Sequence, residues 1–363
     1  MWPNSRIKIL SGLILLVTIA AACGGGGGVP TPSITPRPSG TPTPRSTALP
    51  EVSTPVPVGA EERPIKILVV RESDAATNRI VNDLSEDLTD ELDNFRLGWY
   101  EGLYIEFELV DTQQEALTRI CNSPNTAAFV DAFTYIAAEQ NCGALPALQV
   151  EKDGEQGSNF DLIVFRQRVG AASNLAGRVF CTMDINSITE FVHPALAFRV
   201  IGIDPLDDFS EIATGFESDT EMILAMTGRY EPASRPRCDG AALPTGRLDE
   251  IEEELLDEDR EQNLTQSQFN QVGVLEVTGE DAWEPLPYEI LVFPPNRLMP
   301  EFLREEIVGA FTTLESDEGS AYENLVDLLE HDSLVPVTRL DYNDFREWLV
   351  DKAGWNLANS PVK

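Results

Sequence analysis

The chain has 363 residues, of which 42% are apolar, and a formal net charge of −35 at pH 7. So negative a charge argues against a nucleic-acid-binding protein, because that class needs a basic face to meet the phosphate backbone. From Ile65 onward about 300 residues remain, which is enough for one large or two medium-sized hydrophobic cores.

Residues 1–22 have the pattern of an export signal. Arg6 and Lys8 precede the uncharged apolar run Ile9–Ala22, which is short for a membrane span and ends in small residues. Cys23 follows, and the pattern resembles the signal of bacterial lipoproteins, in which this thiol receives lipid and becomes the mature N-terminus. A plain signal peptide or an uncleaved anchor are the alternatives. In each case we expect the protein to work outside the cytoplasm.

Residues 23–64 have the composition of a disordered linker. Gly24–Gly28 is a flexible start, and the stretch from Pro30 to Pro64 is dominated by Pro, Thr and Ser. Such a composition cannot bury enough apolar surface to offset the entropy of ordering. A proline-rich chain of this length extends up to on the order of 100 Å. We therefore expect a folded part held near the membrane on a long stalk.

The first part of the folded region alternates between strands and helices. The predicted strands are Ile65–Val70, Ile105–Val110, Ala127–Val130 and Leu162–Phe165, and the predicted helices are Thr77–Leu92, Thr112–Cys121 and Phe133–Asn141. This alternation predicts a wound α/β architecture with parallel strands.

The pattern restarts after Gly170. Further strands are predicted over Arg178–Thr182, Gly273–Val277 and Tyr288–Phe293, and further helices over Ile188–Ile201, Thr220–Met226 and Pro300–Leu314. Two similar α/β units indicate two lobes around a cleft. We expect lobe 1 to comprise residues 65–168 and 284–363, and lobe 2 to comprise residues 169–283.

An acidic insertion is predicted within lobe 2, around residues 240–268. Its central segment, Leu248–Glu261, places Leu248, Ile251 and Leu255 on one helix face and acidic residues elsewhere. We interpret it as a solvated surface helix. A calcium- or partner-binding patch is the alternative, although the spacing matches no calcium loop.

Four cysteines besides Cys23 lie in the folded part. An even number in an exported chain favours disulfides over metal binding or catalysis. Three pairings are possible, and we prefer Cys121–Cys142 with Cys181–Cys238, because each pair then lies inside one lobe. Buried free thiols are the alternative for one pair.

No catalytic or metal-binding motif is recognisable. His193 and His331 lie far apart and have no matching Cys, Asp or Glu at zinc-ligand spacing. We expect His193 to pack or cap locally rather than bind a ligand. The sequence has no nucleophile elbow, phosphate loop or His-Glu-x-x-His motif. We therefore expect neither an enzyme nor a bound cofactor or metal.

Several segments, in order and spacing, resemble the phosphate/phosphite/phosphonate-type substrate-binding proteins of ABC importers. The resemblance extends weakly over Ile65–Trp355, and no single motif is diagnostic. Its segments are Gly177–Phe180, Asp184–Ser187, Gly202–Pro205, Phe302–Phe311, Leu334–Val337 and Asp341-Tyr342. It implies a type II periplasmic-binding fold, with two α/β lobes, two crossing strands and hinge closure around a small molecule. It also implies an ABC permease as partner.

The resemblance places ligand contacts at one helix start and in one loop. In lobe 2 an anionic head group would be held by hydroxyls and backbone N–H groups near Ser187, and in lobe 1 by the loop Asp131–Tyr135. This chain departs from the family's Ser-Thr-Ser-Gly turn, because Ser187-Ile188-Thr189-Glu190 stands there and is itself a capping box. Glu217 stands where the family often has histidine, and Asp131 adds a further charge. We therefore expect a neutral or cationic ligand rather than a phosphonate.

The predicted ligand-binding residues are Arg71, Ser73, Asp131, Tyr135, Ser187, Thr189 and Glu217. The first functional hypothesis is a lipid-anchored, monomeric solute-binding protein that delivers a small molecule to an ABC permease. The alternative is a ligand-sensing or scaffold lipoprotein of the same fold without a transport role.

Overall fold

The computed structural model describes residues 56–92, 96–97, 100–101, 103–229, 237–256, 264–277, 283–317 and 319–356. All of them belong to the second of the chain's two units, Thr54–Lys363. The predicted signal, Cys23 and the linker up to residue 55 lie outside the described residues. Within the described ranges, no helix is both long and apolar enough to cross a membrane.

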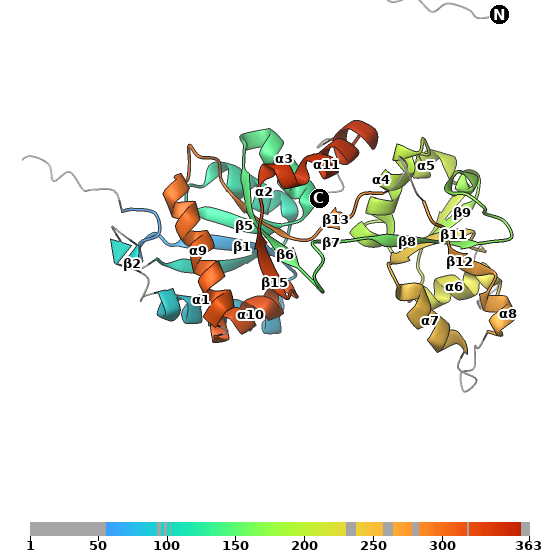
Figure 1. The fold of residues 1–363 in the computed structure, drawn as a ribbon, viewed down its shortest axis with the longest axis horizontal. Helices are drawn as coiled ribbons and strands as arrows, with labels where there is room; N and C mark the ends of the chain where they lie inside the picture. Colours follow the sequence, from blue (N-terminus) through green and yellow to red (C-terminus); the bar gives the residue numbers. More distant parts are fainter. Residues whose placement is uncertain are drawn as a thin grey trace, which may run out of the picture. The chain divides into compact units, whose positions relative to one another are not determined.

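A six-stranded mixed sheet forms the centre of lobe 1 (Figure 1). Its strands, in spatial order, are β15 (Ser333–Pro336), β6 (Leu145–Glu151), β14 (Ile290–Phe293), β5 (Thr126–Val130), β1 (Ile65–Val70) and β4 (Ile105–Val110). β1 pairs in parallel with β4 and β5, whereas β14 runs antiparallel to both β5 and β6. Lobe 1 therefore joins strands from both ends of the folded chain.

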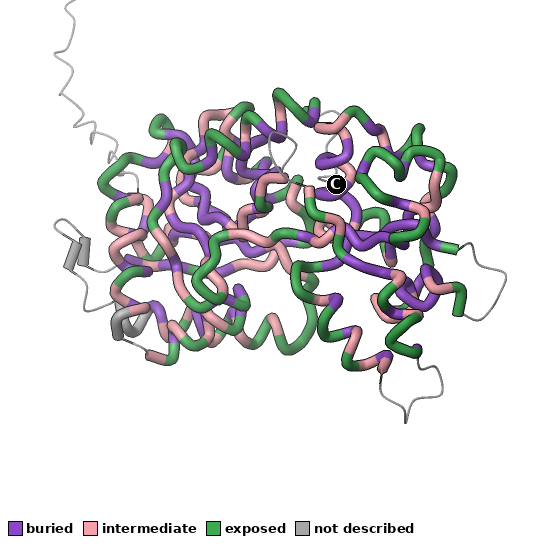
Figure 2. Tube along the Cα trace, turned by 45° about the vertical axis from the view of Figure 1, so that its right-hand side comes forward, coloured by how far each residue is buried: buried purple, intermediate pink, exposed green. Residues whose placement is uncertain are grey.

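Helices cover both faces of this sheet. Successive residues of a strand point to opposite sides, so the apolar side chains of one strand can pack against both layers of helices. On β1, Leu68 packs into one hydrophobic cluster, whereas Ile67 and Val69 pack into another. The first cluster includes α2 (Gln113–Asn122), α3 (Ala132–Cys142) and the C-terminal elements η4 (Arg339–Tyr342), α11 (Asn343–Arg346) and η5 (Glu347–Lys352). The second includes α1 (Ala75–Leu92), α9 (Glu301–Asp317) and α10 (Ser320–Leu329). Figure 2 shows the buried stretches inside and the exposed stretches outside.

Lobe 2 is built on a five-stranded sheet. Its strands, in spatial order, are β10 (Glu211–Ala213), β9 (Val179–Cys181), β11 (Gly240–Pro244), β8 (Phe160–Phe165) and β12 (Val272–Val274). β9, β10 and β11 are parallel, and β8 is antiparallel to β11 and β12. The helical elements of this lobe are η1 (Ala172–Leu175), η2 (Ile188–Val192), α4 (His193–Val200), α5 (Pro205–Asp208), α6 (Asp219–Thr227), α7 (Arg247–Leu256) and α8 (Gln266–Phe269).

The two chain segments that run between the sheets pair with each other. β7 (Gly157–Ser158) is antiparallel to β13 (Leu286–Pro287). A Cβ atom on Gly157 would lie 2.7 Å from the backbone oxygen of Leu286, so only glycine allows this approach. A further short pair, β2 (Arg96–Leu97) with β3 (Tyr100–Glu101), lies apart from the main sheets.

The predicted boundary after residue 168 needs correction. β8 was expected in lobe 1, but it pairs with β11 and β12 in the lobe 2 sheet. The chain therefore passes between the sheets after β6, and residues 160–168 belong with lobe 2. The sequence does not reveal this because the partner β11 is the small-residue segment Gly240–Pro244, which was not predicted as a strand.

The preferred disulfide pairing is confirmed. Cys121 and Cys142 join the ends of α2 and α3 in lobe 1, and Cys181 and Cys238 join β9 to the residues before β11 in lobe 2. Each bond links elements of a single lobe, which leaves the two lobes without a covalent crosslink between them among the described cysteines.

The expected acidic surface helix is α7. Leu248, Ile251 and Leu255 are buried in the lobe 2 core, whereas Asp249 and Glu250 are exposed. The remainder of the predicted acidic helix, residues 257–261, lies outside the described residues.

Candidate ligand-binding site

Three charged residues meet at one edge of the lobe 1 sheet. Register pairs Val69 of β1 with Phe129 of β5 and Ile290 of β14 with Val130, so Arg71, Asp131 and Glu289 follow next to one another. Arg71 Nη2 lies 3.0 Å from Glu289 Oε1. Ligands of open α/β sheets bind beyond the carboxyl ends of the strands, which is where this trio lies.

Asp131 begins α3 as its N-cap. Its Oδ1 accepts a hydrogen bond from the Thr134 N–H at 2.6 Å. Burial raises the pKa of Asp131 above its ordinary value, and the negative charge of Glu289 adds to the effect. A donor that an anionic ligand would need at this helix start is therefore already used by the chain's own carboxylate.

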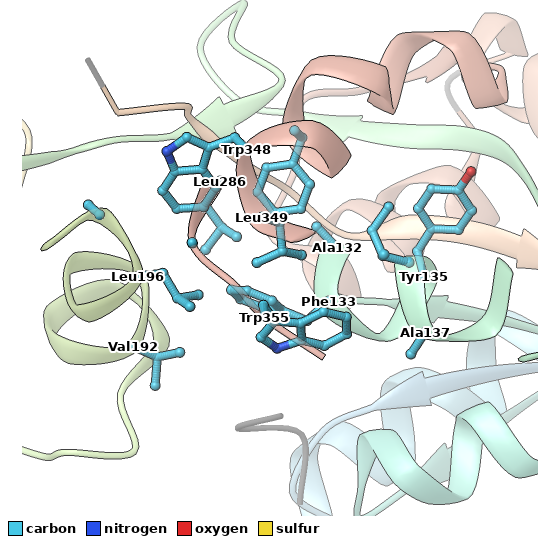
Figure 3. Packing of buried hydrophobic residues seen from close by; sticks show 14 of the residues in the cluster. Ala132, Phe133, Tyr135, Ala137, Val192, Leu196, Leu286, Trp348, Leu349 and Trp355 are labelled. Atoms are coloured by element: carbon cyan, nitrogen blue, oxygen red, sulfur yellow. The ribbon is translucent and has the colours of Figure 1, made fainter. Parts of the chain in front are cut away.

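The other two predicted lobe 1 residues lie in different surroundings. Ser73 is exposed, and its Oγ accepts a hydrogen bond from Asn78 Nδ2 at 2.8 Å. Tyr135 is fully buried, and its ring centroid lies 4.8 Å from that of Tyr342. Figure 3 shows Tyr135 among the packed residues of α3. Its aromatic surface thus contributes to the lobe 1 core in this conformation.

In lobe 2, three helical elements begin at one sheet edge, because each follows a parallel strand. η2 follows β9, α6 follows β10 and α7 follows β11. Ser187 caps η2 by accepting from the Glu190 N–H at 3.3 Å, and Ser218 caps α6 by accepting from the Glu221 N–H at 3.3 Å. Both helix starts are therefore satisfied by local hydroxyls.

This lobe 2 edge is acidic. Burial raises the pKa of Glu190, and the charges of Asp219 and Asp184 raise it further. Asp219 Oδ2 lies 3.1 Å from Arg247 Nε, so one of these carboxylates is paired. Glu217 is exposed, and its N–H donates to Glu221 Oε2 at 2.8 Å.

Thr189 is partly buried in the first turn of η2, which is a π-helical segment. Such segments are rare and frequently lie at functional sites. The sequence shows the capping box here but not the π-helical geometry, since that depends on how η2 continues into α4.

The predicted residues therefore form two sets. Arg71 and Asp131 lie at the lobe 1 edge, and Ser187, Thr189 and Glu217 lie at or near the lobe 2 edge. No hydrogen bond or ion pair between described residues joins these two sets. Glu289, Asp219 and Arg247 were not predicted as site residues. Glu289 was placed inside the predicted strand Tyr288–Phe293, but β14 begins only at Ile290, and Arg247 follows the unpredicted β11.

Comparison with known proteins identifies the family. A family model described as ABC transporter, phosphonate, periplasmic substrate-binding protein matches residues 67–342. The chain belongs to this family. No match was found among curated protein sequences.

Two solved structures of one protein show the same fold at low sequence identity. The protein XAC2383 from Xanthomonas citri, solved with chloride ion, is 13% identical, with a TM-score of 0.51 over 80% of this chain and 96% of that chain. The same protein bound to ATP gives 12% identity, a TM-score of 0.51 and coverage of 80% and 95%. A binding protein component of an ABC phosphonate transporter from Pseudomonas aeruginosa is 14% identical, with a TM-score of 0.47 and coverage of 79% and 86%.

Two hollows among the described residues lie in lobe 2 away from the predicted contacts. Their volumes are about 320 and 700 Å³, and residues 275–277 line both. Neither is lined by a predicted ligand residue. In the part of the chain that the structure describes, no group of three His, Cys, Asp or Glu side chains is arranged to hold a metal ion.

His193 packs at the junction of the lobes. The sequence predicted packing or local capping, but its contacts are with residues distant in the chain. Its Nε2 lies 2.9 Å from the backbone oxygen of Glu284, on the segment that returns to lobe 1. Its ring meets Trp348 of η5 edge-on at 5.5 Å and Phe160 at 5.0 Å. Figure 3 shows Val192 and Leu196, the neighbours of His193, facing Trp348 and Trp355. Burial lowers the pKa of His193 to about 4.

We expect this histidine to make the protein less stable in mild acid. Because the pKa of His193 is lower in the folded protein than in the unfolded chain, the unfolded chain binds the proton first as the pH falls. The free energy of unfolding is therefore fully retained above pH 6.5 and decreases as the pH falls towards 4. Between pH 7 and pH 5 the loss from His193 is about 2 kcal/mol. Urea denaturation of wild type and His193→Gln at both pH values measures it.

Glutamine retains a donor for the Glu284 carbonyl but does not titrate. Since the second depressed histidine, His331, is present in both proteins, its contribution cancels in the comparison. An equal loss of stability in wild type and variant between pH 7 and pH 5 would contradict the assignment.

Proposed function

We propose that the protein is an extracytoplasmic solute-binding protein, anchored to the membrane through lipid on Cys23, that delivers a small molecule to an ABC permease. The family match across residues 67–342 carries this proposal. The basic start, the apolar run Ile9–Ala22 and the following Cys23 support the anchor. The protein acts as a monomer and without covalent chemistry, its ligand held between the two lobes.

The ligand is neutral or cationic. In this chain the helix starts that would bind an anion are satisfied internally, by Asp131 for α3 and by Ser187 for η2. Glu190 and Asp219 add negative charge at the lobe 2 edge. A carboxylate within about 4 Å of a bound anion opposes it by about 1 to 4 kcal/mol, for effective dielectric constants between about 80 and 20. Several such carboxylates favour a ligand that carries positive charge or donates hydrogen bonds.

Arg71 does not change the preference for a neutral or cationic ligand, because the positive charge of Arg71 is already paired with a carboxylate. Its guanidinium pairs with Glu289 at 3.0 Å, and both side chains are partly buried. Asp131, beside that pair, has no cationic partner among the described residues. Asp131 is therefore the lobe 1 group that we assign to the positive or donor end of the ligand.

A thermal-shift screen of Thr54–Lys363 tests the proposal. The panel contains methylphosphonate, inorganic phosphate, primary and quaternary amines, and neutral polyols. We expect stabilisation by an amine or a neutral compound, amounting to about 2.7 kcal/mol at a hundredfold excess over the dissociation constant. Stabilisation by methylphosphonate alone would overturn the ligand assignment while leaving the family role in place.

Asp131→Asn is the informative variant, because asparagine caps a helix as well as aspartate but carries no charge. We expect it to weaken binding of a cationic ligand while leaving the fold intact. Asp249→Asn removes the same charge from the exposed face of α7 and serves as the control. If no compound binds wild type, the scaffold alternative gains support.

A further inference from the structure

A cluster of arginines lies at the edge of the lobe 2 sheet that faces away from the candidate ligand site. Arg178 precedes β9 and Arg237 lies just before β11, at the amino ends of two parallel strands. β8 runs antiparallel to β11, so its carboxyl end brings Arg166 and Arg168 to the same edge. α6 starts at the ligand edge and ends at Gly228, followed by Arg229. We call these five residues the arginine edge.

The arginine edge is compact. Arg168 and Arg237 both lie against the buried ring of Phe165, with guanidinium carbons 4.9 and 4.6 Å from its centroid. Burial lowers the pKa of Arg168, and the positive charges of Arg237 and Arg178 add to the effect. Like charges are therefore held close together on a fixed aromatic support.

Few of the carboxylates that the structure describes offset this charge. Asp239 lies 2.5 Å from Arg168, and among the described residues this is the only ion pair that the arginine edge makes. Arg166, Arg229 and Arg237 are exposed. Arg168 Nε is buried without a hydrogen-bond partner. Asp208 at the end of α5 and Glu211 at the start of β10 form an acidic border on one side.

This concentration of positive charge is unexpected in a chain whose net charge is −35. Charges farther apart than the Debye length, about 8 Å at physiological salt, are largely screened from one another. A surface that meets this edge therefore experiences mainly the arginines and not the distant carboxylates. Guanidinium groups bind phosphate oxygens through paired, planar hydrogen bonds, which suits them to phosphate-rich surfaces.

We propose that the arginine edge docks lobe 2 onto the phosphate head groups of anionic membrane lipids. This rests on the membrane anchoring proposed above, which keeps the folded part within reach of such a surface. Docking through this edge leaves the opposite, ligand-binding edge of lobe 2 open.

Vesicle co-sedimentation of Thr54–Lys363 tests the proposal, because this compact unit lacks the anchor and binds only through its own surface. The vesicles contain phosphatidylcholine alone or with one-third phosphatidylglycerol. We expect binding to the anionic vesicles only. For Arg166→Gln/Arg229→Gln we expect a loss of about 25-fold, at about fivefold for each basic residue near the surface. High salt should abolish binding.

The matched control is Arg79→Gln/Arg297→Gln, which removes two exposed charges from lobe 1. Equal binding to both kinds of vesicle, or an equal loss in the control, overturns the proposal. Stabilisation of the unit by pyrophosphate without binding to vesicles also overturns the proposal, because it would indicate that the arginine edge binds a free phosphate compound. The two proposals are separated by their variants: Asp131→Asn at the ligand site should leave vesicle binding unchanged, and Arg166→Gln/Arg229→Gln should leave stabilisation by amines or neutral compounds unchanged.

Discussion

Replacement of Trp348 by alanine should lower the free energy of unfolding by about 3–5 kcal/mol, the usual range for a fully buried aromatic residue. Trp348 is 1% exposed. Its ring stacks on Phe345 at 5.9 Å and meets the edge of His193 at 5.5 Å. Since His193 belongs to α4 of lobe 2 and Trp348 to the C-terminal segment packed on lobe 1, the cavity opens where the lobes meet.

Urea denaturation measures this loss, and Trp348→Phe provides the control. Phenylalanine keeps an aromatic ring for both contacts and removes the indole N–H, which is buried without a hydrogen-bond partner. We expect the phenylalanine variant to lose less than about 1.5 kcal/mol. A loss of less than about 1 kcal/mol for the alanine variant would show that the lobe junction does not depend on this ring.

The strands that carry the fold were predictable where their own residues specify them. Ile65–Val70 was predicted with the bounds that β1 has, because a β-branched, nearly continuous apolar run is typical of a central strand covered on both faces. The helices α2 and α3 were predicted to within a residue or two. Their starts, at Thr112 and Asp131, carry side-chain caps that a local sequence reveals.

Other strands depend on partners that are distant in sequence. β6 contains Pro146, and β11 consists mainly of glycine and alanine, so neither has strong strand propensity. Both are strands because neighbours complete them: β14 and β15 flank β6, and β8 and β9 flank β11. The assignment of β8 to lobe 1 failed for the same reason, since sheet membership is a matter of pairing and not of local pattern.

The candidate site also contains features that the local sequence predicts and features that depend on residues distant in sequence. The cap at Ser187 was predicted from the sequence, because capping involves residues three apart, whereas Asp131 was predicted as a ligand contact and not as a cap. The ion pairs Arg71–Glu289 and Arg247–Asp219 were not visible, because the first joins residues beside two different strands and the second joins the first residues of two helices. The burial of Tyr135 against Tyr342 depends on the C-terminal segment returning to α3, which no local signal predicts.

Removal of the lobe 2 disulfide should destabilise the protein more than removal of the lobe 1 disulfide. Closing a loop removes conformational entropy from the unfolded chain, and the effect grows with loop length. Cys181 and Cys238 are 57 residues apart, against 21 for Cys121 and Cys142. We expect Cys181→Ala/Cys238→Ala to lose about 4 kcal/mol and Cys121→Ala/Cys142→Ala about 3 kcal/mol.

Hydrogen exchange distinguishes the two variants, because each disulfide is confined to one lobe. The loop closed by Cys181–Cys238 contains α4, α5, β10 and α6, so its loss should deprotect these elements first, with the lobe 1 sheet retaining its protection. The lobe 1 variant should reverse the pattern. Uniform deprotection of both sheets in either variant would mean that the two lobes unfold as one unit. The junction around Trp348 and His193 would then couple the lobes more strongly than each disulfide stabilises its own lobe.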